Sequence, residues 1–232
     1  MTTTFDEAHR VAELRAAEAR ARELFAAIGA AGLIRAGVSE DELSAEIFAL
    51  AAERFDVAEH WHKRLVRAGP NTVATFYDET TNRVLGDDDI AFVDLGPVFD
   101  GWEADFGATW VLGADPMKLR LRADLEAVWR ELRDLYLADA AMTGARLYAA
   151  AHEAAERRGW TFGGKIAGHL VGEFPHSAFP GGREESVIFP ANVTPMRDKD
   201  ADGRERYWIL EVHLVEPAGT FGGFCERLLL AD

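Results

Sequence analysis

Two histidines stand close together in the stretch GHLVGEFPH, residues 168–176, on a chain that has only 7 histidines. They are His169 and His176, separated by a glycine, an acidic residue and a proline among others. Near neutral pH an imidazole either binds a metal ion or exchanges a proton. The stretch therefore marks a place where metal binding, proton transfer or both are expected.

Four carboxylates interrupt segments that otherwise have the apolar composition of strands. Asp94 lies in AFVDLGP, Asp105 in WEADFGATW, Glu211 in WILEVHL and Glu226 in GGFCERLLL. Burial of an uncompensated carboxylate is costly. A turn or a solvent-facing position is the common explanation for any one of them. Together with His169, however, they make a set of four carboxylates and one imidazole, which is the type of set that divalent cations bind.

With these residues the chain resembles the metallopeptidases of the pita-bread fold: methionine aminopeptidases, aminopeptidase P, prolidase and creatinases. The resemblance runs from about Leu33 to Leu230. It rests on the eleven-residue interval from Asp94 to Asp105 around a strand hairpin, and on GHLVGEFPH, which looks like the family's glycine–histidine stretch with a second histidine seven positions on. It implies an α+β protein with the pita-bread fold, a single-domain member in which residues 1–32 form an N-terminal helical extension and residues 33–232 the catalytic domain.

The resemblance also implies a dinuclear metal centre. One ligand position fits two glutamates: the dipeptide EP favours Glu216, whereas the fifteen-residue interval to Glu226 favours Glu211, which we choose. Asp94 would bind one ion and His169 the other, Asp105 and Glu226 would bridge both, and Glu211 would complete the second site. The implied ligands are Asp94, Asp105, His169, Glu211 and Glu226, for two divalent ions of manganese, cobalt, zinc or iron.

Two such ions can supply hydroxide near neutral pH and polarise a carbonyl group. The resemblance therefore implies an aminopeptidase-like hydrolase of peptide or small amide C–N bonds. His176 would donate to the carbonyl oxygen or its tetrahedral adduct, and Glu211 would also pass a proton towards the leaving nitrogen. The alternative for His176 is a histidine satisfied by backbone groups in a turn.

Phe76 is a departure from the family pattern. It stands in GPNTVATFY, where the peptidases that the chain resembles carry a histidine that helps to protonate the leaving amine. His60 and His62 would alternate onto one strand face with Arg64, so His62 is the third catalytic candidate; the alternative is a surface strand with scattered histidines. Two main hypotheses remain, an active hydrolase and a catalytically altered relative that serves as a binding module. Oxidative chemistry at a di-iron centre is a weaker third.

The elements that must position these residues follow from the sequence pattern. Helices are expected from Phe5 to Ile28, after Ser39, and over residues 116–137. Ser39 followed by Glu42 forms a capping box, and a shift of 104 residues places Thr143 on Ser39, which suggests two similar halves. Gly- and Pro-punctuated strands follow the helices in each half, which predicts helices covering one side of a curved, mostly antiparallel sheet.

Composition limits the partners. With 40 acidic against 25 basic residues, the net charge of −15 repels phosphate backbones and anionic lipids. The single cysteine, Cys225, cannot form an internal disulfide, and the sequence shows neither a signal-peptide pattern nor an apolar run long enough for a bilayer. We therefore expect a cytoplasmic protein that binds neither nucleic acid nor a membrane. The resemblance implies a short peptide or small amide as its partner, and homodimer formation is left open.

Overall fold

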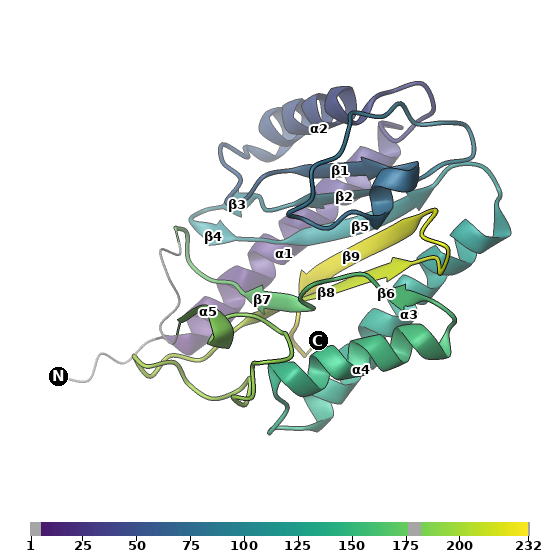
Figure 1. Cartoon of the computed structure of the whole chain (residues 1–232). Coiled ribbons are helices and arrows are strands. Elements are labelled where there is room, and N and C mark those ends of the chain that lie inside the picture. The colour runs from purple at the N-terminus through teal and green to yellow at the C-terminus, as the bar shows by residue number, and fades with distance from the viewer. Residues whose placement is uncertain (1–5, 176–181, 232) are drawn as a thin grey trace.

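The computed structural model of the chain describes residues 6–175 and 182–231 (Figure 1). Its helices are α1 (Glu7–Ala30), α2 (Glu40–Phe55), α3 (Pro116–Ala138), α4 (Gly144–Arg157) and the short α5 (Gly182–Glu185), with a 3₁₀ turn η1 (Gly69–Val73). Its strands are β1 (Leu65–Ala68), β2 (Ile90–Leu95), β3 (Val98–Phe99), β4 (Trp102–Glu103), β5 (Phe106–Val111), β6 (Thr161–Phe162), β7 (Gly168–Leu170), β8 (Trp208–Val215) and β9 (Gly222–Leu228).

Within these described ranges, seven strands form one sheet, in the order β1-β2-β5-β9-β8-β6 with β7 also beside β8. All the strand pairs are antiparallel, and β3 and β4 form a separate hairpin. The expected α+β class with an antiparallel sheet is confirmed. The strands of the N-terminal half, β1, β2 and β5, meet those of the C-terminal half where β5 pairs with β9.

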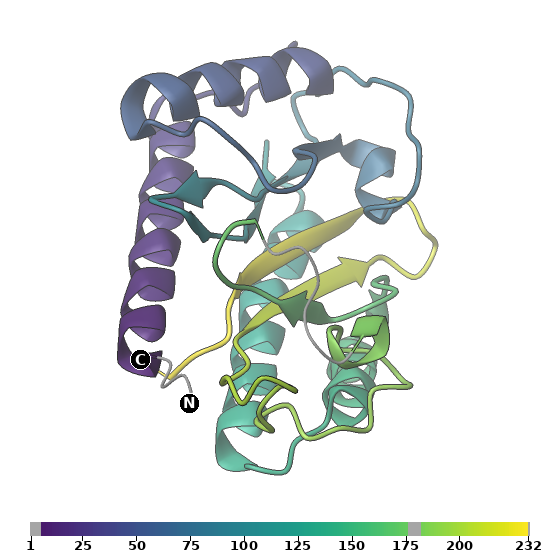
Figure 2. The same cartoon turned by 90° about the vertical axis from the view of Figure 1, so that its left-hand side faces the viewer.

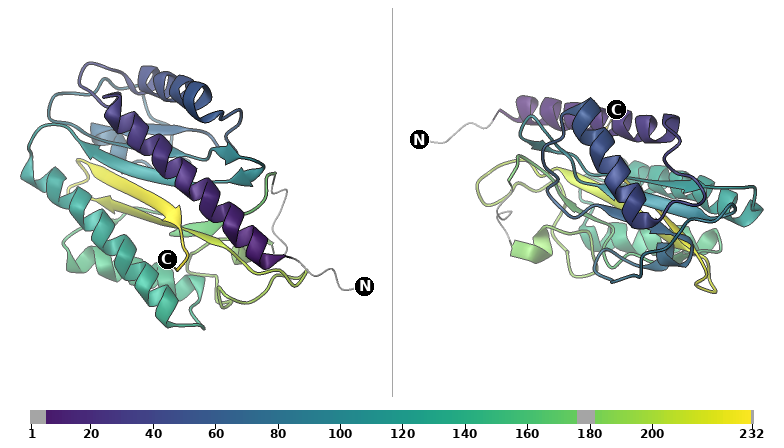
Figure 3. Two further views of the ribbon diagram at one scale, coloured as in Figure 1. Left: turned by 180° about the vertical axis from the view of Figure 1, so that it is seen from behind. Right: turned by 90° about the horizontal axis from the view of Figure 1, so that it is seen from above.

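The long helices cover one face of the sheet. Seen from behind, α1 and α3 lie on the near side of the sheet and run roughly along its strands (Figure 3, left), and α4 packs beside α3. Figure 2 shows α1 running down one side of the molecule with α2 crossing above it. One hydrophobic cluster joins α1 and α2 to the N-terminal half of the sheet, and a second joins α3 and α4 to β8 and β9.

The start of one helix in each half follows the predicted repeat. Ser39 accepts a hydrogen bond from the backbone of Glu42, and the Glu42 side chain accepts one from the Ser39 backbone, so the predicted capping box is confirmed. Thr143 caps α4 in the same way by accepting from the backbone N–H of Arg146. The helices begin at Glu40 and Gly144, which is the predicted shift of 104 residues.

The N-terminal helix α1 buries Leu14, Leu24 and Ile28 in the cluster that it shares with α2. The boundary between an extension, residues 1–32, and a catalytic domain, residues 33–232, stays a prediction. None of the described helices is both long enough and apolar enough to span a bilayer.

Side chains alternate between the two faces of the sheet, as strand geometry requires. In β2, Ala91 and Val93 enter the cluster on the helix side. Phe92 lies in a small separate cluster with Phe224 of β9, and Asp94 lines the same cavity as these two rings. The face opposite the helices therefore carries both the aromatic side chains and the carboxylates.

Candidate metal centre

Three of the carboxylates predicted from the sequence lie in one row across the sheet. Asp94 of β2 is opposite Gly107 of β5, Gly107 is opposite Glu226 of β9, and Glu226 is opposite Glu211 of β8. Because paired residues point to the same face of a sheet, the three carboxylates share the face that carries the cavity. They come from β2, β8 and β9, so only the assembled sheet brings them together.

Gly107 is the one position of this row that has no side chain. A Cβ atom there would lie 2.6 Å from Cε1 of Phe224 and 3.1 Å from Cβ of Glu226. Glycine is therefore needed for both side chains of β9 to occupy the face.

Asp105 enters the cluster from a different kind of position. The segment WEADFGATW has the composition of one strand, but the structure divides it: β4 ends at Glu103 and β5 begins at Phe106. Asp105 lies in the break between them, where the chain leaves the β3–β4 hairpin for the sheet. Its side chain is 2% exposed.

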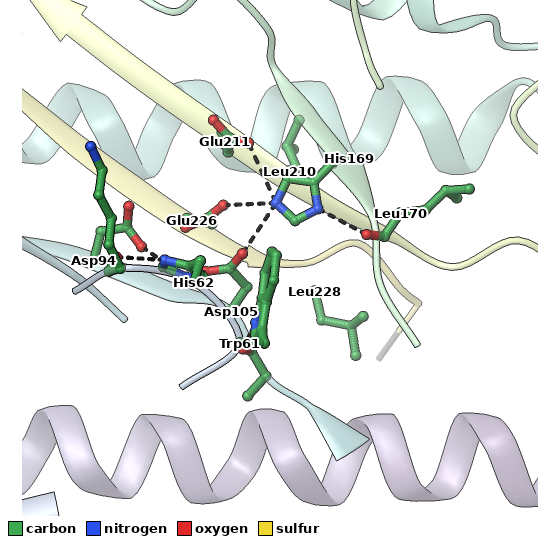
Figure 4. Close-up of polar contacts among 12 residues, drawn as sticks. Trp61, His62, Asp94, Asp105, His169, Leu170, Leu210, Glu211, Glu226 and Leu228 are labelled. Carbon is green, nitrogen blue, oxygen red and sulfur yellow. Dashed lines mark hydrogen bonds and ion pairs between the residues drawn. The ribbon is translucent and has the colours of Figure 1, made fainter. Parts of the chain in front are cut away.

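His169 stands on the short strand β7, beside β8. Its Nδ1 lies 2.8 Å from the carbonyl oxygen of Leu170, and because a carbonyl only accepts, Nδ1 carries the proton. Nε2 faces the carboxylates, as Figure 4 shows. It lies 3.1 Å from Oδ2 of Asp105, 3.6 Å from Oε1 of Glu226 and 3.7 Å from Oε1 of Glu211.

His62 reaches the same cluster from the segment before β1. Its Nε2 lies 3.2 Å from Oδ1 of Asp105 and 3.6 Å from Oδ1 of Asp94 (Figure 4). The prediction that His60 and His62 share a strand face with Arg64 is wrong, because β1 begins only at Leu65 and the chain bends at residues 61 and 62. His60 instead lies near Phe48, with ring centroids 6.1 Å apart.

The donor set fits metal ions better than a set of hydrogen bonds. Asp94 is 5% exposed, and its Oδ1 has no hydrogen-bond partner. The single Nε2 of His169 faces three carboxylate oxygens, although an imidazole nitrogen has at most one proton to donate. Donor atoms that share one ion at about 2.1 Å lie roughly 3.0 to 3.4 Å apart, so the observed spacings of 3.1 to 3.7 Å need only a small contraction.

Burial is the main cause of the shifted titration of three carboxylates in the cluster. Burial raises the pKa of Asp94 to about 7 and that of Glu211 to about 8. Burial, with Asp105 and Asp94 as further causes, raises the pKa of Glu226 well above its ordinary value.

The other three groups of the cluster shift in the direction of ion pairing. Burial alone would lower the pKa of each histidine, but the neighbouring carboxylates outweigh it and raise the pKa of His62 to about 10 and that of His169 to about 9. Burial would raise the pKa of Asp105, but His62 and His169 hold it below its ordinary value. The six groups therefore cannot all keep their ordinary charges without a compensating cation.

The remaining predicted residues have different positions. Glu216 is partly exposed and accepts hydrogen bonds from the backbone of Ala218 and Thr220 in its own turn, away from the cluster. His176, the predicted substrate-binding histidine, lies outside the described residues. Phe76 lines the cavity, with its ring centroid 5.8 Å from that of His62.

A cavity of about 300 Å³ opens beside the cluster. Asp94, Asp105, His169, Glu211 and Glu226 all line it. Its other walls are largely apolar: Trp61, Leu65, Phe76, Tyr77, Phe92, Ile166, Leu170 and Phe224. The arrangement can place a small, partly apolar molecule against the carboxylates.

Trp61 is a site residue that the sequence analysis missed. Its ring lies edge-on to both histidine rings, at centroid distances of 4.5 Å from His62 and 5.4 Å from His169. Its Nε1 donates to the carbonyl of Ala104, at 2.9 Å. The tripeptide HWH alone gives no sign of this position, because the bend that directs Trp61 between the histidines depends on the segment around Gly96.

Comparisons with known proteins identify the family and the fold of the chain. The model of metallopeptidase family M24 matches residues 12–197. None of the curated proteins matches the sequence. Among solved structures, a Xaa-Pro dipeptidase from Bacillus anthracis matches with a TM-score of 0.72 at 20% identity. The match covers 100% of this chain and 59% of the dipeptidase chain. The prolidase from Thermococcus sibiricus matches with a TM-score of 0.71 at 19% identity, and the match covers 97% of this chain and 57% of the prolidase chain.

The methionine aminopeptidase from Rickettsia prowazekii has a TM-score of 0.72 at 14% identity, and the match covers 98% of this chain and 95% of the aminopeptidase. These likenesses confirm the expected pita-bread fold. This chain spans less than two thirds of the length of the prolidase and dipeptidase structures.

Proposed function

The chain belongs to metallopeptidase family M24, and we propose that it is a dinuclear metal-dependent hydrolase of peptide or small amide C–N bonds, with an aminopeptidase-like mechanism. One observation carries the proposal. The five proposed ligands converge on the wall of a largely apolar cavity, and the buried Oδ1 of Asp94 among them has no hydrogen-bond partner.

The cluster divides into two groups of donors that share Asp105. Asp94 would hold one ion and His169 with Glu211 would hold the other, while Asp105 and Glu226 would contribute to both. When bound, two divalent ions supply a water of lowered pKa and an electrophile that polarises the substrate carbonyl.

The protein's own groups would bind the substrate and move its protons. Glu211 is 16% exposed through its side chain, whereas Glu226 is 3% exposed, so Glu211 is the more accessible of the two from the cavity. Glu211 would accept a proton at Oε1 and deliver it towards the leaving nitrogen. The ring of Phe76 lies at the cavity wall and has no proton to give, so leaving-group protonation is expected to be the weak step.

The apolar walls favour an apolar group beside the scissile bond, since burying it removes apolar surface from water. His176 remains a proposed donor to the substrate carbonyl.

Metal-loaded protein tests the proposal directly. Protein stripped of metal and reloaded with Mn²⁺, Co²⁺, Zn²⁺ or Fe²⁺ in turn should release the first residue from peptides or anilides, and a chelator should abolish the activity. Glu226→Gln should lower the rate by at least about a hundredfold, whereas Glu216→Gln, at the exposed turn, should retain it. Fully loaded protein that cleaves no amide would instead support the binding-module alternative.

A further inference from the structure

The carboxylate cluster contains a second imidazole that the five proposed ligands leave unused. We propose that His62 is a sixth protein ligand, bound through Nε2 to the ion held by Asp94 and Asp105. The proposal rests on the proposed metal centre and extends it. The centre would then have two imidazoles and four carboxylates, with one imidazole for each ion.

The two histidines have matching surroundings. Nδ1 of His62 lies 2.7 Å from the carbonyl oxygen of Lys63, the next residue, as Nδ1 of His169 lies 2.8 Å from the carbonyl oxygen of Leu170. A backbone carbonyl fixes the proton on Nδ1 in each ring and leaves the lone pair of a neutral imidazole on Nε2. Each Nε2 faces one oxygen of Asp105, with Oδ1 on the side of His62 and Oδ2 on the side of His169.

The carboxylates around His62 also need an occupant between them. Oδ1 of Asp94 is buried without a hydrogen-bond partner and lies 3.6 Å from Nε2 of His62, beyond hydrogen-bond range. Asp105 lies 3.2 Å from the same nitrogen. One ion between the three atoms would satisfy both carboxylates, whereas a proton on Nε2 would serve only one of them.

The local backbone holds His62 in this place. The N–H of Trp61 donates to the carbonyl of Gly96, at 2.9 Å, and this pairing directs the next side chain into the cluster. A Cβ atom on Gly96 would lie 2.2 Å from Cδ2 and 2.5 Å from Nε2 of His62. The His62 ring therefore occupies space that exists because residue 96 is glycine, and its side chain is only 8% exposed.

Charge balance agrees with a neutral His62. Four ionised carboxylates offset the charge of two divalent ions when both imidazoles are neutral. Two imidazoles and four carboxylates are also the donors that hold pairs of iron or manganese ions in carboxylate-bridged helical bundles. Mn²⁺ and Fe²⁺ are accordingly the ions with which the proposal is best tested.

The experiment counts ions and imidazole ligands instead of turnover. The full-length protein is stripped with a chelator, reloaded with Mn²⁺ or Fe²⁺, freed of excess metal and submitted to elemental analysis. Pulsed electron paramagnetic resonance on the Mn²⁺ form, with ¹⁵N-labelled histidine, then reports the bound imidazoles. Wild-type protein should hold two ions and two imidazole nitrogens. His62→Ala should lose one imidazole signal and weaken one ion at least about tenfold.

Matched variants separate ligation from other roles. His60→Ala changes a histidine two positions away that lies outside the cluster, and it should leave both counts unchanged. Gly96→Ala should displace the His62 ring, so it should also lose one imidazole signal and weaken one ion, although all six proposed ligand residues are still in the chain. If His62→Ala does not fold, His62→Gln, which keeps a similar volume, takes its place in the same measurements.

Three results would overturn the proposal. Wild-type affinity for both ions in His62→Ala, with the imidazole count unchanged, would show that His62 is no ligand. Tighter binding in that variant would show that His62 is a protonated counter-ion that competes with the metal. Wild-type protein that binds no ion would remove the metal centre itself, whereas two bound ions without hydrolysis would contradict only the proposed activity.

Discussion

Replacing Phe76 by histidine should increase the cleavage of unactivated peptides. Phe76 lines the cavity, and its ring lies 5.8 Å from that of His62, so an imidazole in its place would stand next to the proposed reaction site. A positioned general acid contributes roughly 10² to 10⁴ in rate when an amine must be protonated as it leaves. The full gain is not expected here, because of a neighbouring charge.

That charge belongs to Lys63, whose Nζ lies 4.5 Å from the centroid of the Phe76 ring. A cation at this distance disfavours a protonated imidazole. The Lys63 side chain is exposed, so solvent screens the effect, and we take it as about one pKa unit, or a tenfold smaller protonated fraction at neutral pH. The expected gain in rate from Phe76→His is therefore about 10 to 10³. Adding Lys63→Ala to Phe76→His should recover part of the rate that the charge of Lys63 takes away.

The assay compares kcat/KM on an unactivated peptide and on its anilide, whose leaving group needs less protonation. Phe76→His should raise the first value and leave the second nearly unchanged, and Phe76→Leu should raise neither. Metal content and melting temperature are measured alongside, because the imidazole fills less of an apolar wall and can lack a hydrogen-bond partner there. Equal gains on both substrates, or no gain with both ions bound, would refute the assignment of Phe76 to the general-acid position.

Three further predictions concern the surroundings of the site. Mn²⁺ should quench the fluorescence of Trp61, whose ring lies beside both histidine rings. The variant Trp61→Phe should lose most of this quenching, and the control Trp160→Phe should lose little. Unchanged quenching in Trp61→Phe would argue against metal at the cluster. Burial raises the pKa of Glu18 to about 7, so the charge on Glu18 destabilises the fold increasingly from pH 4.5 to 7. The free energy of unfolding of Glu18→Gln should therefore exceed that of the wild type above pH 7 by up to about 3 kcal/mol. The same difference at pH 4.5, measured by denaturant titration, would contradict this. At Gly168 φ is +137°, and a Cβ atom would lie 2.0 Å from a carbonyl oxygen of β8. Gly168→Ala should therefore lower the free energy of unfolding by more than about 3 kcal/mol and disturb the metal centre. Gly219 has φ +71° and open space around it, so Gly219→Ala should lower the free energy of unfolding by only about 1 to 2 kcal/mol.

The elements that depend on local chemistry could be predicted from the sequence. The capping box of Ser39 and Glu42 marks the start of α2 because each side chain bonds a backbone group three residues away. Asp94, Glu211 and Glu226 stood out because each interrupts an apolar strand, where an unpaired charge is costly. The resemblance implied that they act as one ligand set, but their place in one row depends on the strand order of the folded sheet, which the sequence did not indicate.

Features that depend on distant backbone could not be predicted in the same way. His62 was expected to share a strand face with His60, but a bend caused by pairing with the Gly96 region directs it into the cluster. Asp105 lies in a break between two strands that its apolar neighbours do not indicate. The choice of Glu211 over Glu216 depended on spacing alone, and the structure places only Glu211 next to His169.

The metal content of two glutamate variants tests the central claim most directly. Glu211→Ala and Glu216→Ala remove the same group, five positions apart, from the cluster and from an exposed turn respectively. After reloading with Mn²⁺ and removal of excess metal, wild-type protein and Glu216→Ala should each retain two ions per chain, and Glu211→Ala should retain one. Retention of two ions by Glu211→Ala with loss in Glu216→Ala, or no bound metal in the wild-type protein, would contradict the account.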